Sequence, residues 1–263
     1  MGISYFKYFF HDLKKYRHYV AYSVKSNLKA ELSNTVLGYL WWLLDPMLHM
    51  LVYTFLVQVL FQRGTPAFPV YVFAALLPWK VATSAMMQSA DCIRSNAGII
   101  KQVYLPKFVL PLIGIATNSI KLLFGFVVLF GMMVVYGIEF TWHIVEVLPV
   151  LAVFLLFYYS ISIFLTHFGV LFKDMRYLLN YLIMFWFFGS PGIWTLDRLP
   201  LSWQEWIWLN PNVAFFMSFR NVFMYGESPY YKWLAIWVLV ALFFLLIGIP
   251  NLYRSDKNYT KVI

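Results

Sequence analysis

The sequence predicts an all-helical integral membrane protein, a bundle of six spanning helices. Hydrophobic residues make up 62% of its 263 residues and charged residues only 12%, and the mean hydropathy is +0.70. A soluble domain of this size could not hide so much apolar surface, because its outside must be largely polar. The apolar residues also gather in long runs, and a hydrocarbon core about 30 Å thick needs roughly 20 apolar residues per helical crossing.

Six segments are suited to cross the bilayer. Each is expected to be helical, since backbone polar groups in lipid must be bonded within their own segment. The net charge of +9 reflects topology rather than nucleic-acid binding, because Lys and Arg gather before the first span, in alternate connections and in the tail. By the positive-inside rule this predicts that both termini are cytoplasmic. The predicted spans are residues 36–61, 68–90, 108–137, 147–172, 177–194 and 230–252.

A basic amphipathic helix is expected before the first span, within residues 1–35. Between residues 12 and 32, apolar side chains recur every three or four positions and basic ones occupy other faces. Such a helix lies in the cytoplasmic interface instead of crossing the membrane, and a plain anchor is the alternative. Its basic residues include Lys14, Arg17, Lys25 and Lys29.

The first two spans contain unusual polar residues. Asp45, which precedes Pro46, and His49 can face each other one helical turn apart. Lys80 lies in the second span, whose cytoplasmic half is rich in polar side chains. Ionisable groups at this depth are costly, so they are functional candidates, with a structural polar pair as the alternative.

The connection after the second span is basic and cytoplasmic, over residues 94–107. Ile99, Ile100 and Val103 would share one face of a short helix that Pro106 stops. A helix of this kind suits docking to a soluble partner, although an ordinary loop fits the pattern equally well.

The segment after the fifth span is apolar but interrupted. Residues 195–229 contain many Trp, Phe and Leu side chains, yet prolines and charges prevent a run of twenty apolar residues. We expect two short helices that dip partway into the membrane from outside. They would act as an outer gate, or merely as a lid on the bundle.

Known catalytic signatures do not occur in the sequence. It has no phosphate-binding loop, no H-E-x-x-H, no paired-cysteine motif and no G-x-S-x-G, and Cys92 is its sole cysteine. Intramembrane charge is limited to Asp45, Lys80 and Lys121, which is too little for an ion-coupled transporter. We therefore expect a transport subunit and no enzyme, with no metal or cofactor on this chain.

Several short motifs follow one another along nearly the whole chain. They are Leu37-Gly38-Tyr39-Leu40-Trp41 before Pro46, Leu77-Pro78-Trp79, Asn96 to Lys101, Leu105-Pro106-Lys107, Leu110-Pro111, Phe172-Lys173-Asp174-Met175-Arg176, Ser190-Pro191-Gly192-Ile193-Trp194, Leu199-Pro200, Leu209-Asn210-Pro211 and Phe219-Arg220. In this order they resemble the permease subunit of ABC-2-type exporters, in the branch that exports wall teichoic acid and O-antigen polysaccharide.

The resemblance implies partners and roles. Two copies of the permease would pair with two ABC ATPase subunits, which bind the ATP and Mg²⁺, in the bacterial cytoplasmic membrane. The copies would meet along the first and fifth spans. Residues 36–252 would form the transmembrane domain, followed by a cytoplasmic tail at 253–263. Residues 95–107 would be the coupling segment, and residues 195–224 the re-entrant helices near the outer exit.

The resemblance and the topology together assign three sets of candidate residues. Coupling to the ATPase is assigned to Asn96, Ile99, Ile100, Lys101, Val103, Tyr104, Lys173, Asp174 and Arg176. The translocation path is assigned to Trp41, Trp42, Asp45, His49, Tyr53, Phe55, Lys80, Phe185 and Trp186. The outer gate is assigned to Pro191, Trp194, Pro211, Phe215, Phe219 and Arg220.

The resemblance also implies the cargo, a polyprenyl-diphosphate-linked polymer, with teichoic acid favoured over O-antigen. The aromatic content of 21% fits this cargo, because sugars and prenyl chains pack well on aromatic faces. Rival functions are an ABC-2 exporter of a drug or small lipid, and a membrane enzyme acting on polyprenyl phosphates. The enzyme would depend on Asp45 or His49 and need no partner.

Overall fold

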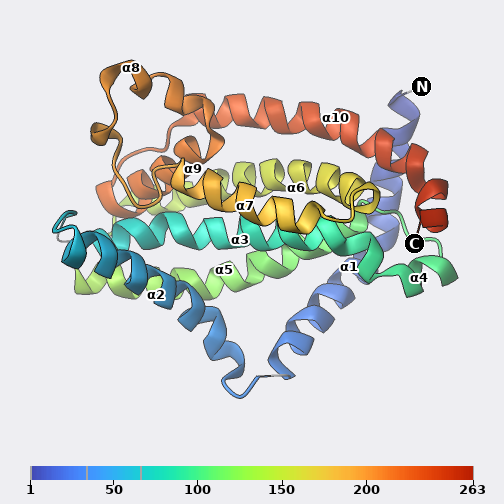
Figure 1. Cartoon of the computed structure of the whole chain (residues 1–263), viewed down its shortest axis with the longest axis horizontal. Helices are drawn as coiled ribbons and strands as arrows, with labels where there is room; N and C mark the ends of the chain where they lie inside the picture. Colours follow the sequence, from blue (N-terminus) through green and yellow to red (C-terminus); the bar gives the residue numbers. More distant parts are fainter. Residues whose placement is uncertain (1, 34, 66, 263) are drawn as a thin grey trace.

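The computed structural model describes residues 2–33, 35–65 and 67–262. Throughout these ranges the regular elements are helices and helical turns, which confirms the all-helical class (Figure 1). Five helical segments in the described ranges are long and apolar enough to cross a membrane, and they correspond to the first four predicted spans and the last. Their elements are η1 (Gly38–Leu40), α2 (Trp41–Thr54) and η2 (Phe55–Leu60); α3 (Phe68–Ser95); α5 (Val109–Val135); η3 (Trp142–Glu146) and α6 (Val147–Leu171); and α10 (Tyr231–Val262).

The predicted fifth span, residues 177–194, is helical over only part of its range. Its helix, α7 (Met175–Phe188), has 14 residues. At 1.5 Å per residue it is about 21 Å long, shorter than a hydrocarbon core of about 30 Å. The helix ends at Gly189, and Pro191 follows, which has no backbone N–H to continue the ladder. A short helix therefore stands where the sequence predicted a full crossing.

The region predicted as two short helices, residues 195–224, contains one helix of more than a single turn. That helix is α9 (Pro211–Arg220), and the π-helical turn η6 (Asn221–Tyr225) extends it. The side chain of Asn210 caps α9 by accepting a hydrogen bond from the Asn212 N–H at 3.1 Å. Before α9, three short turns project beyond the bundle (Figure 1). These turns are η4 (Leu196–Arg198), α8 (Leu201–Gln204) and η5 (Trp206–Leu209).

Helix α3 lies at the centre of the bundle and packs against α2, α5, α6, α7 and α9. Small residues allow its neighbours to approach closely. At Gly169 of α6, an added Cβ would lie 1.9 Å from the carbonyl oxygen of Ala90 on α3. The obstacle is backbone, so no side-chain rotation can relieve it. The same α6 packs along α10 on its other side.

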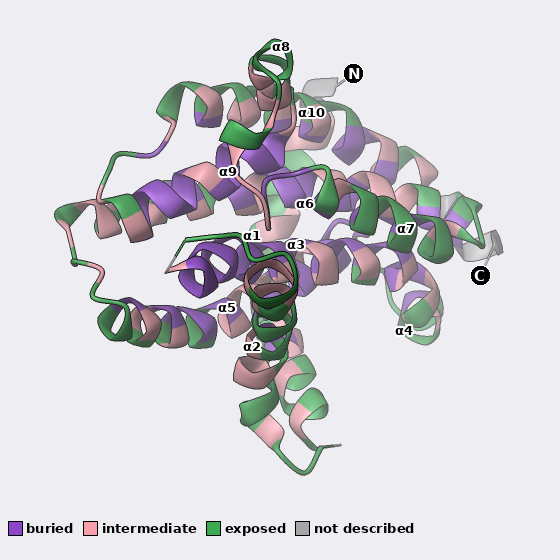
Figure 2. Cartoon of the chain, turned by 60° about the vertical axis from the view of Figure 1, so that its left-hand side comes forward, coloured by how far each residue is buried: buried purple, intermediate pink, exposed green. Residues whose placement is uncertain are grey.

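Helices α1 (Gly2–Ser33) and α2 form two arms that splay away from the bundle and meet near residues 35–37 (Figures 1 and 2). Before it diverges, α1 packs on α5 and α10. Tyr253 of α10 donates a hydrogen bond to the Asp12 carboxylate at 2.9 Å. The apolar side chains that recur along α1 pack on the core of the bundle, through Leu13, Tyr16, Val20, Val24 and Leu28.

The two ends of the bundle differ in the elements that they carry. The short helix α4 (Ala97–Gln102), the first half of α1 and the last turns of α10 lie at one end (Figure 1). The turn between α2 and α3 and the projecting α8 lie at the other. We call these the α4 end and the α8 end.

Substituting Gly169→Ala is expected to destabilise the protein by about 1–3 kcal/mol, because α3 and α6 must separate to admit the methyl group. The measurement is the thermal unfolding midpoint of the purified protein in detergent. Gly131→Ala on α5 is the matched control, since a Cβ there meets no atom within 4 Å. It should leave the midpoint unchanged or raise it, because alanine favours the helix. Equal losses in both variants would contradict the close contact of α3 and α6.

Candidate functional site

The second half of α3 has a polar face. Lys80, Ser84, Gln88, Asp91 and Ser95 are spaced by three or four residues, which places them on one side of the helix. This side lines two neighbouring cavities, bounded on their other walls by α1, α2 and α5. The polar half of the second span that the sequence indicated therefore lines two open cavities.

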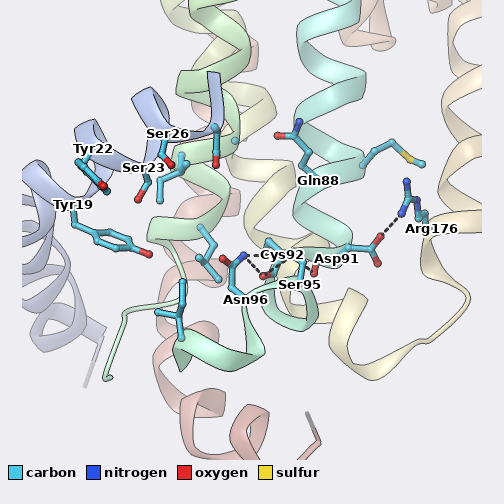
Figure 3. Close-up of a pocket in the computed structure, with 16 residues that line it drawn as sticks. Tyr19, Tyr22, Ser23, Ser26, Gln88, Asp91, Cys92, Ser95, Asn96 and Arg176 are labelled. Carbon is cyan, nitrogen blue, oxygen red and sulfur yellow. Dashed lines mark hydrogen bonds and ion pairs between the residues drawn. The ribbon is translucent and has the colours of Figure 1, made fainter. Parts of the chain in front are cut away.

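The larger of the two, which we call the interface cavity, has a volume of about 600 Å³ and lies toward the α4 end. Hydroxyl groups of α1 face polar side chains of α3 across it (Figure 3). Asp91 accepts a hydrogen bond from Arg176 of α7 at 3.1 Å at its edge. Its labelled lining residues are Tyr19, Tyr22, Ser23, Ser26, Gln88, Asp91, Cys92, Ser95, Asn96 and Arg176.

The smaller, which we call the charged cavity, has a volume of about 310 Å³ and lies between the two arms and the bundle. The Lys80 ammonium is 2.9 Å from Oδ2 of Asp45 and 3.3 Å from Nε2 of His49. Nδ1 of His49 lies 2.9 Å from the backbone oxygen of Asp45. A neutral imidazole with its proton on Nδ1 satisfies both contacts, because Nδ1 then donates and Nε2 accepts. Three predicted path residues thus form one cluster.

The charged cavity contains a second ion pair, which was not predicted from the sequence. The Lys121 ammonium of α5 is 2.6 Å from Oε2 of Glu31, in the last turns of α1. Two features of the sequence pointed to these residues separately: Lys121 is a lone lysine inside the third span, and Glu31 is an acid within a basic helix. Nothing in the sequence indicated that these two would meet, because they are 90 residues apart.

The remaining predicted path residues do not join this cluster. Trp41 and Trp42 line the charged cavity, but Phe55 and Phe185 are exposed on η2 and α7. Trp186 packs on Trp79, with ring centroids 5.8 Å apart, and its Nε1 donates to Asn210 at 2.9 Å. The Tyr53 ring lies tilted against the Phe187 ring, with centroids 5.5 Å apart. These aromatics connect α2, α3 and α7, and the nine residues do not line one continuous wall.

The predicted coupling segment forms a sharp corner at the α4 end. Nδ2 of Asn96 donates to the carbonyl of Cys92 at 2.7 Å, and α4 follows at once. Ile99 and Val103 are exposed, whereas Ile100 is buried against the bundle. The prediction that these three apolar residues share a face is therefore wrong for Ile100, which anchors α4 to its own chain.

Other predicted coupling residues lie at the same end. Lys101, Lys173 and Asp174 are exposed, and Arg94 donates to the Lys173 carbonyl at 3.5 Å, which holds the turn between α6 and α7 beside α3. Tyr16 of α1 donates to the backbone oxygen of Tyr104 at 3.2 Å. Burial raises the pKa of the Tyr104 phenol to about 12, with the Asp256 charge adding to the effect, so the phenol stays neutral.

The four basic residues singled out on α1 are all exposed. Lys14, Arg17, Lys25 and Lys29 lie away from the core, on the faces that the apolar pattern leaves free. This arrangement suits contact with anionic lipid headgroups or with an acidic partner surface.

Most residues predicted to form an outer gate are buried in packing contacts. Phe215 and Phe219 are fully buried, and Pro191 and Pro211 are buried as well. Trp194 is the exception, because it lines a cavity of about 730 Å³ at the α8 end. Arg220, the remaining predicted gate residue, is buried as well. Five of the six predicted gate residues therefore do not line open space.

Arg220 ties α9 to the rest of the bundle. Its guanidinium donates to the carbonyl oxygens of Tyr71, Pro191 and Gly192 at 3.0, 2.5 and 2.8 Å. It also stacks on the Tyr71 ring, with Cζ 3.4 Å from the centroid. Two of these carbonyls, those of Pro191 and Gly192, lie in the turn after α7, and the third belongs to Tyr71 in α3. Together the contacts explain how a charged residue is fully buried.

Comparison with known proteins gives a consistent group of relatives. Residues 20–224 match the family described as ABC-2 type transporter. The chain is 31% identical over 220 residues to the O-antigen export system permease protein RfbA of Myxococcus xanthus, which covers 83% of this chain and 85% of that protein. It is 25% identical over 238 residues to the RfbA permease of Klebsiella pneumoniae, covering 90% and 92%. It is 26% identical over 237 residues to the polysialic acid transport protein KpsM of Escherichia coli, covering 84% and 87%.

Replacing Arg220→Ala is expected to lower the thermal unfolding midpoint severely or to abolish accumulation of folded protein. The carbonyls of Pro191 and Gly192, which lie outside any helix, would lose their donor, and each unsatisfied group costs about 1–3 kcal/mol. Arg220→Lys keeps the charge but cannot reach all three acceptors, so it should give an intermediate loss that remains measurable. Arg198→Ala, at an exposed arginine of the same region, is the control. Normal stability of both Arg220 variants would refute this role.

Proposed function

The chain belongs to the ABC-2 type transporter family, and we propose that it is the permease of an exporter that moves a lipid-linked polysaccharide out of the cell. The observation that carries the proposal is similarity over more than four-fifths of the length of permeases named for O-antigen export and polysialic acid transport. Those names favour a polysaccharide over a drug or small lipid. The preference for teichoic acid and the polyprenyl-diphosphate linkage stay predictions.

In the proposed topology the α4 end is cytoplasmic and the membrane is the bacterial cytoplasmic membrane. The density of Lys and Arg at that end supports this orientation. The five long helices each cross once, and α7 with the turn after it completes a sixth crossing. The buried helix α9 then re-enters from outside, held by Arg220. Residues 1–35 remain the proposed interface helix and 253–263 the proposed tail, in which α10 continues without a break to Val262.

Energy is proposed to come from two ABC ATPase subunits that bind ATP and Mg²⁺. The exposed apolar side chains of Ile99, on α4, and Val103, directly after it, support a docking site here, because solvent-exposed apolar side chains at a cytoplasmic corner suit a protein partner. Lys173 and Asp174 are exposed at the same end and would border it. Closure of the ATPase pair would then push on α4 and α1.

The permease is proposed to act as a pair of identical copies that meet along α2 and α7. Both helices expose much of their apolar surface (Figure 2), and α2 also presents the half-exposed Asp45. A charged residue on a membrane-facing surface is costly unless protein or water covers it. A second copy would supply that cover and enclose a path between the two chains.

Docking to the ATPase predicts a strong effect of charge at the exposed apolar side chains of α4 and of the residue after it. The double variant Ile99→Asp, Val103→Asp should reduce the ATPase activity of the purified complex, and the polysaccharide at the cell surface, by about tenfold or more. Val135→Asp, at an exposed position near the α8 end, is the control and should retain both. Full activity and surface polymer in the double variant would remove α4 from the coupling.

Pairing along α7 can be tested by cross-linking, because Cys92 is the sole cysteine and is buried. In a Cys92→Ala background, Phe185→Cys should give an oxidised band of twice the chain mass in membranes. Leu239→Cys, an equally exposed position on α10, should stay monomeric. Cross-linking at Leu239 but not at Phe185 would contradict the proposed interface.

A further inference from the structure

The charged cavity contains two lysines at a depth where a cation requires an explanation. Lys80 lies 15 residues before the end of α3, and Lys121 lies 12 residues after the start of α5. At 1.5 Å per residue these positions are about 22 and 18 Å from the α4 end of their helices, so the proposed topology places them inside the hydrocarbon region. Intramembrane cations of this kind usually mark a substrate or ion pathway.

The cations and their partners sit on different parts of the molecule. Both lysines belong to α3 and α5, which pack along each other in the bundle. Both carboxylates belong to the splayed arms, Glu31 to the last turns of α1 and Asp45 to α2 (Figure 1). The lysine side chains are 29% and 21% exposed, against 51% for Asp45 and 41% for Glu31. The carboxylates are thus the half of each pair that can leave without disturbing the bundle.

The surroundings indicate what would replace the carboxylates. Two ammonium groups facing one cavity suit an anion with several oxygens, and lysine is a common phosphate ligand. Trp41 and Trp42 line the same cavity and offer faces on which a sugar ring can stack. The cavity lies between the arms and the bundle, so a headgroup could enter it sideways from the bilayer.

We propose that Lys80 and Lys121 bind the phosphate-bearing headgroup of the lipid-linked substrate, and that Asp45 and Glu31 hold this site as internal anions until the arms move. The inference rests on the proposed function and adds a substrate site to it. Binding of the headgroup would break both ion pairs at once and release the α1–α2 arms. Because α1 also forms part of the α4 end, occupancy of the site would be sensed where the ATPase is proposed to dock.

The test measures lipid binding to the full-length chain in phosphatidylcholine nanodiscs by native mass spectrometry, with polyprenyl diphosphate as the probe. The double variant Lys80→Gln, Lys121→Gln should bind about tenfold more weakly or worse, through loss of two charge-assisted contacts. Asp45→Asn and Glu31→Gln should bind several-fold more tightly, because each removes a competing anion. Lys232→Gln, at an exposed lysine outside the cavity, is the control and should match the unmodified chain.

A charge swap separates this role from a purely structural one. Glu31→Lys with Lys121→Glu restores the ion pair but moves the cation from the bundle to the arm. A structural pair predicts normal stability and normal binding, whereas the proposal predicts normal stability with weak binding. Normal binding in the swap, or weaker binding in Asp45→Asn and Glu31→Gln, would overturn the proposal. The swap also covers the case in which the double lysine variant does not fold.

Two further measurements identify the source of the phosphate. Phosphatidylglycerol or inorganic diphosphate binding as tightly as polyprenyl diphosphate would overturn assignment to the substrate, leaving a general anion site. Surface polysaccharide is measured in cells carrying the same variants. Export that survives in the lysine variants refutes this site alone, whereas absence of export by the unmodified chain with its ATPase refutes the proposed function.

Discussion

A charge inside a bilayer must be matched by the protein itself, and this constraint accounts for how the helices of this chain are held together. Arg220 fixes α9 by donating to the carbonyls of Tyr71, Pro191 and Gly192. At the α4 end, the nearly buried Lys107 is 2.7 Å from Asp256 and fastens α10 to the loop before α5. Each pairing joins elements far apart in the sequence. Apolar packing alone would allow the helices to slide, since lipid competes equally for apolar surface.

The same constraint is met differently in the two halves of the molecule. Around α3, α6 and α9 it is met by fully buried contacts, and small residues such as Gly169 bring the backbones together. Along the arms it is met by partly exposed ion pairs that bridge cavities. The arms also pack on the bundle through apolar side chains, among them Leu13 and Val20 of α1 and Met50 of α2. The molecule therefore combines a firmly packed body with two arms whose charged contacts with it are partly exposed.

Sequence periodicity predicted the elements that depend on local pattern. The apolar face of α1, including Val24 and Leu28, and the five long spans follow from hydropathy and a 3.6-residue repeat. The length of α7 could not be predicted in the same way. Hydropathy depends only on how apolar a segment is, whereas Gly189 and Pro191 determine where this helix ends. Ile100 was placed on the wrong side of α4, since only the tertiary fold decides which face meets the bundle. The contact between Asp45 and His49 was predicted from their i,i+4 spacing. The contact that Lys80 makes with them from another helix was not, because spacing along one helix says nothing about neighbouring helices.

The contact between Asp12 and Tyr253 joins residues separated by 241 positions. Because a chain is made from its N-terminus, α1 is complete long before the helix that it finally contacts. During that interval its apolar face needs another surface, and the exposed Lys14, Arg17, Lys25 and Lys29 would keep it on the anionic lipid headgroups. The order of synthesis thus gives the basic face of α1 a use during biogenesis, because it would bind α1 to the membrane surface until α10 is made.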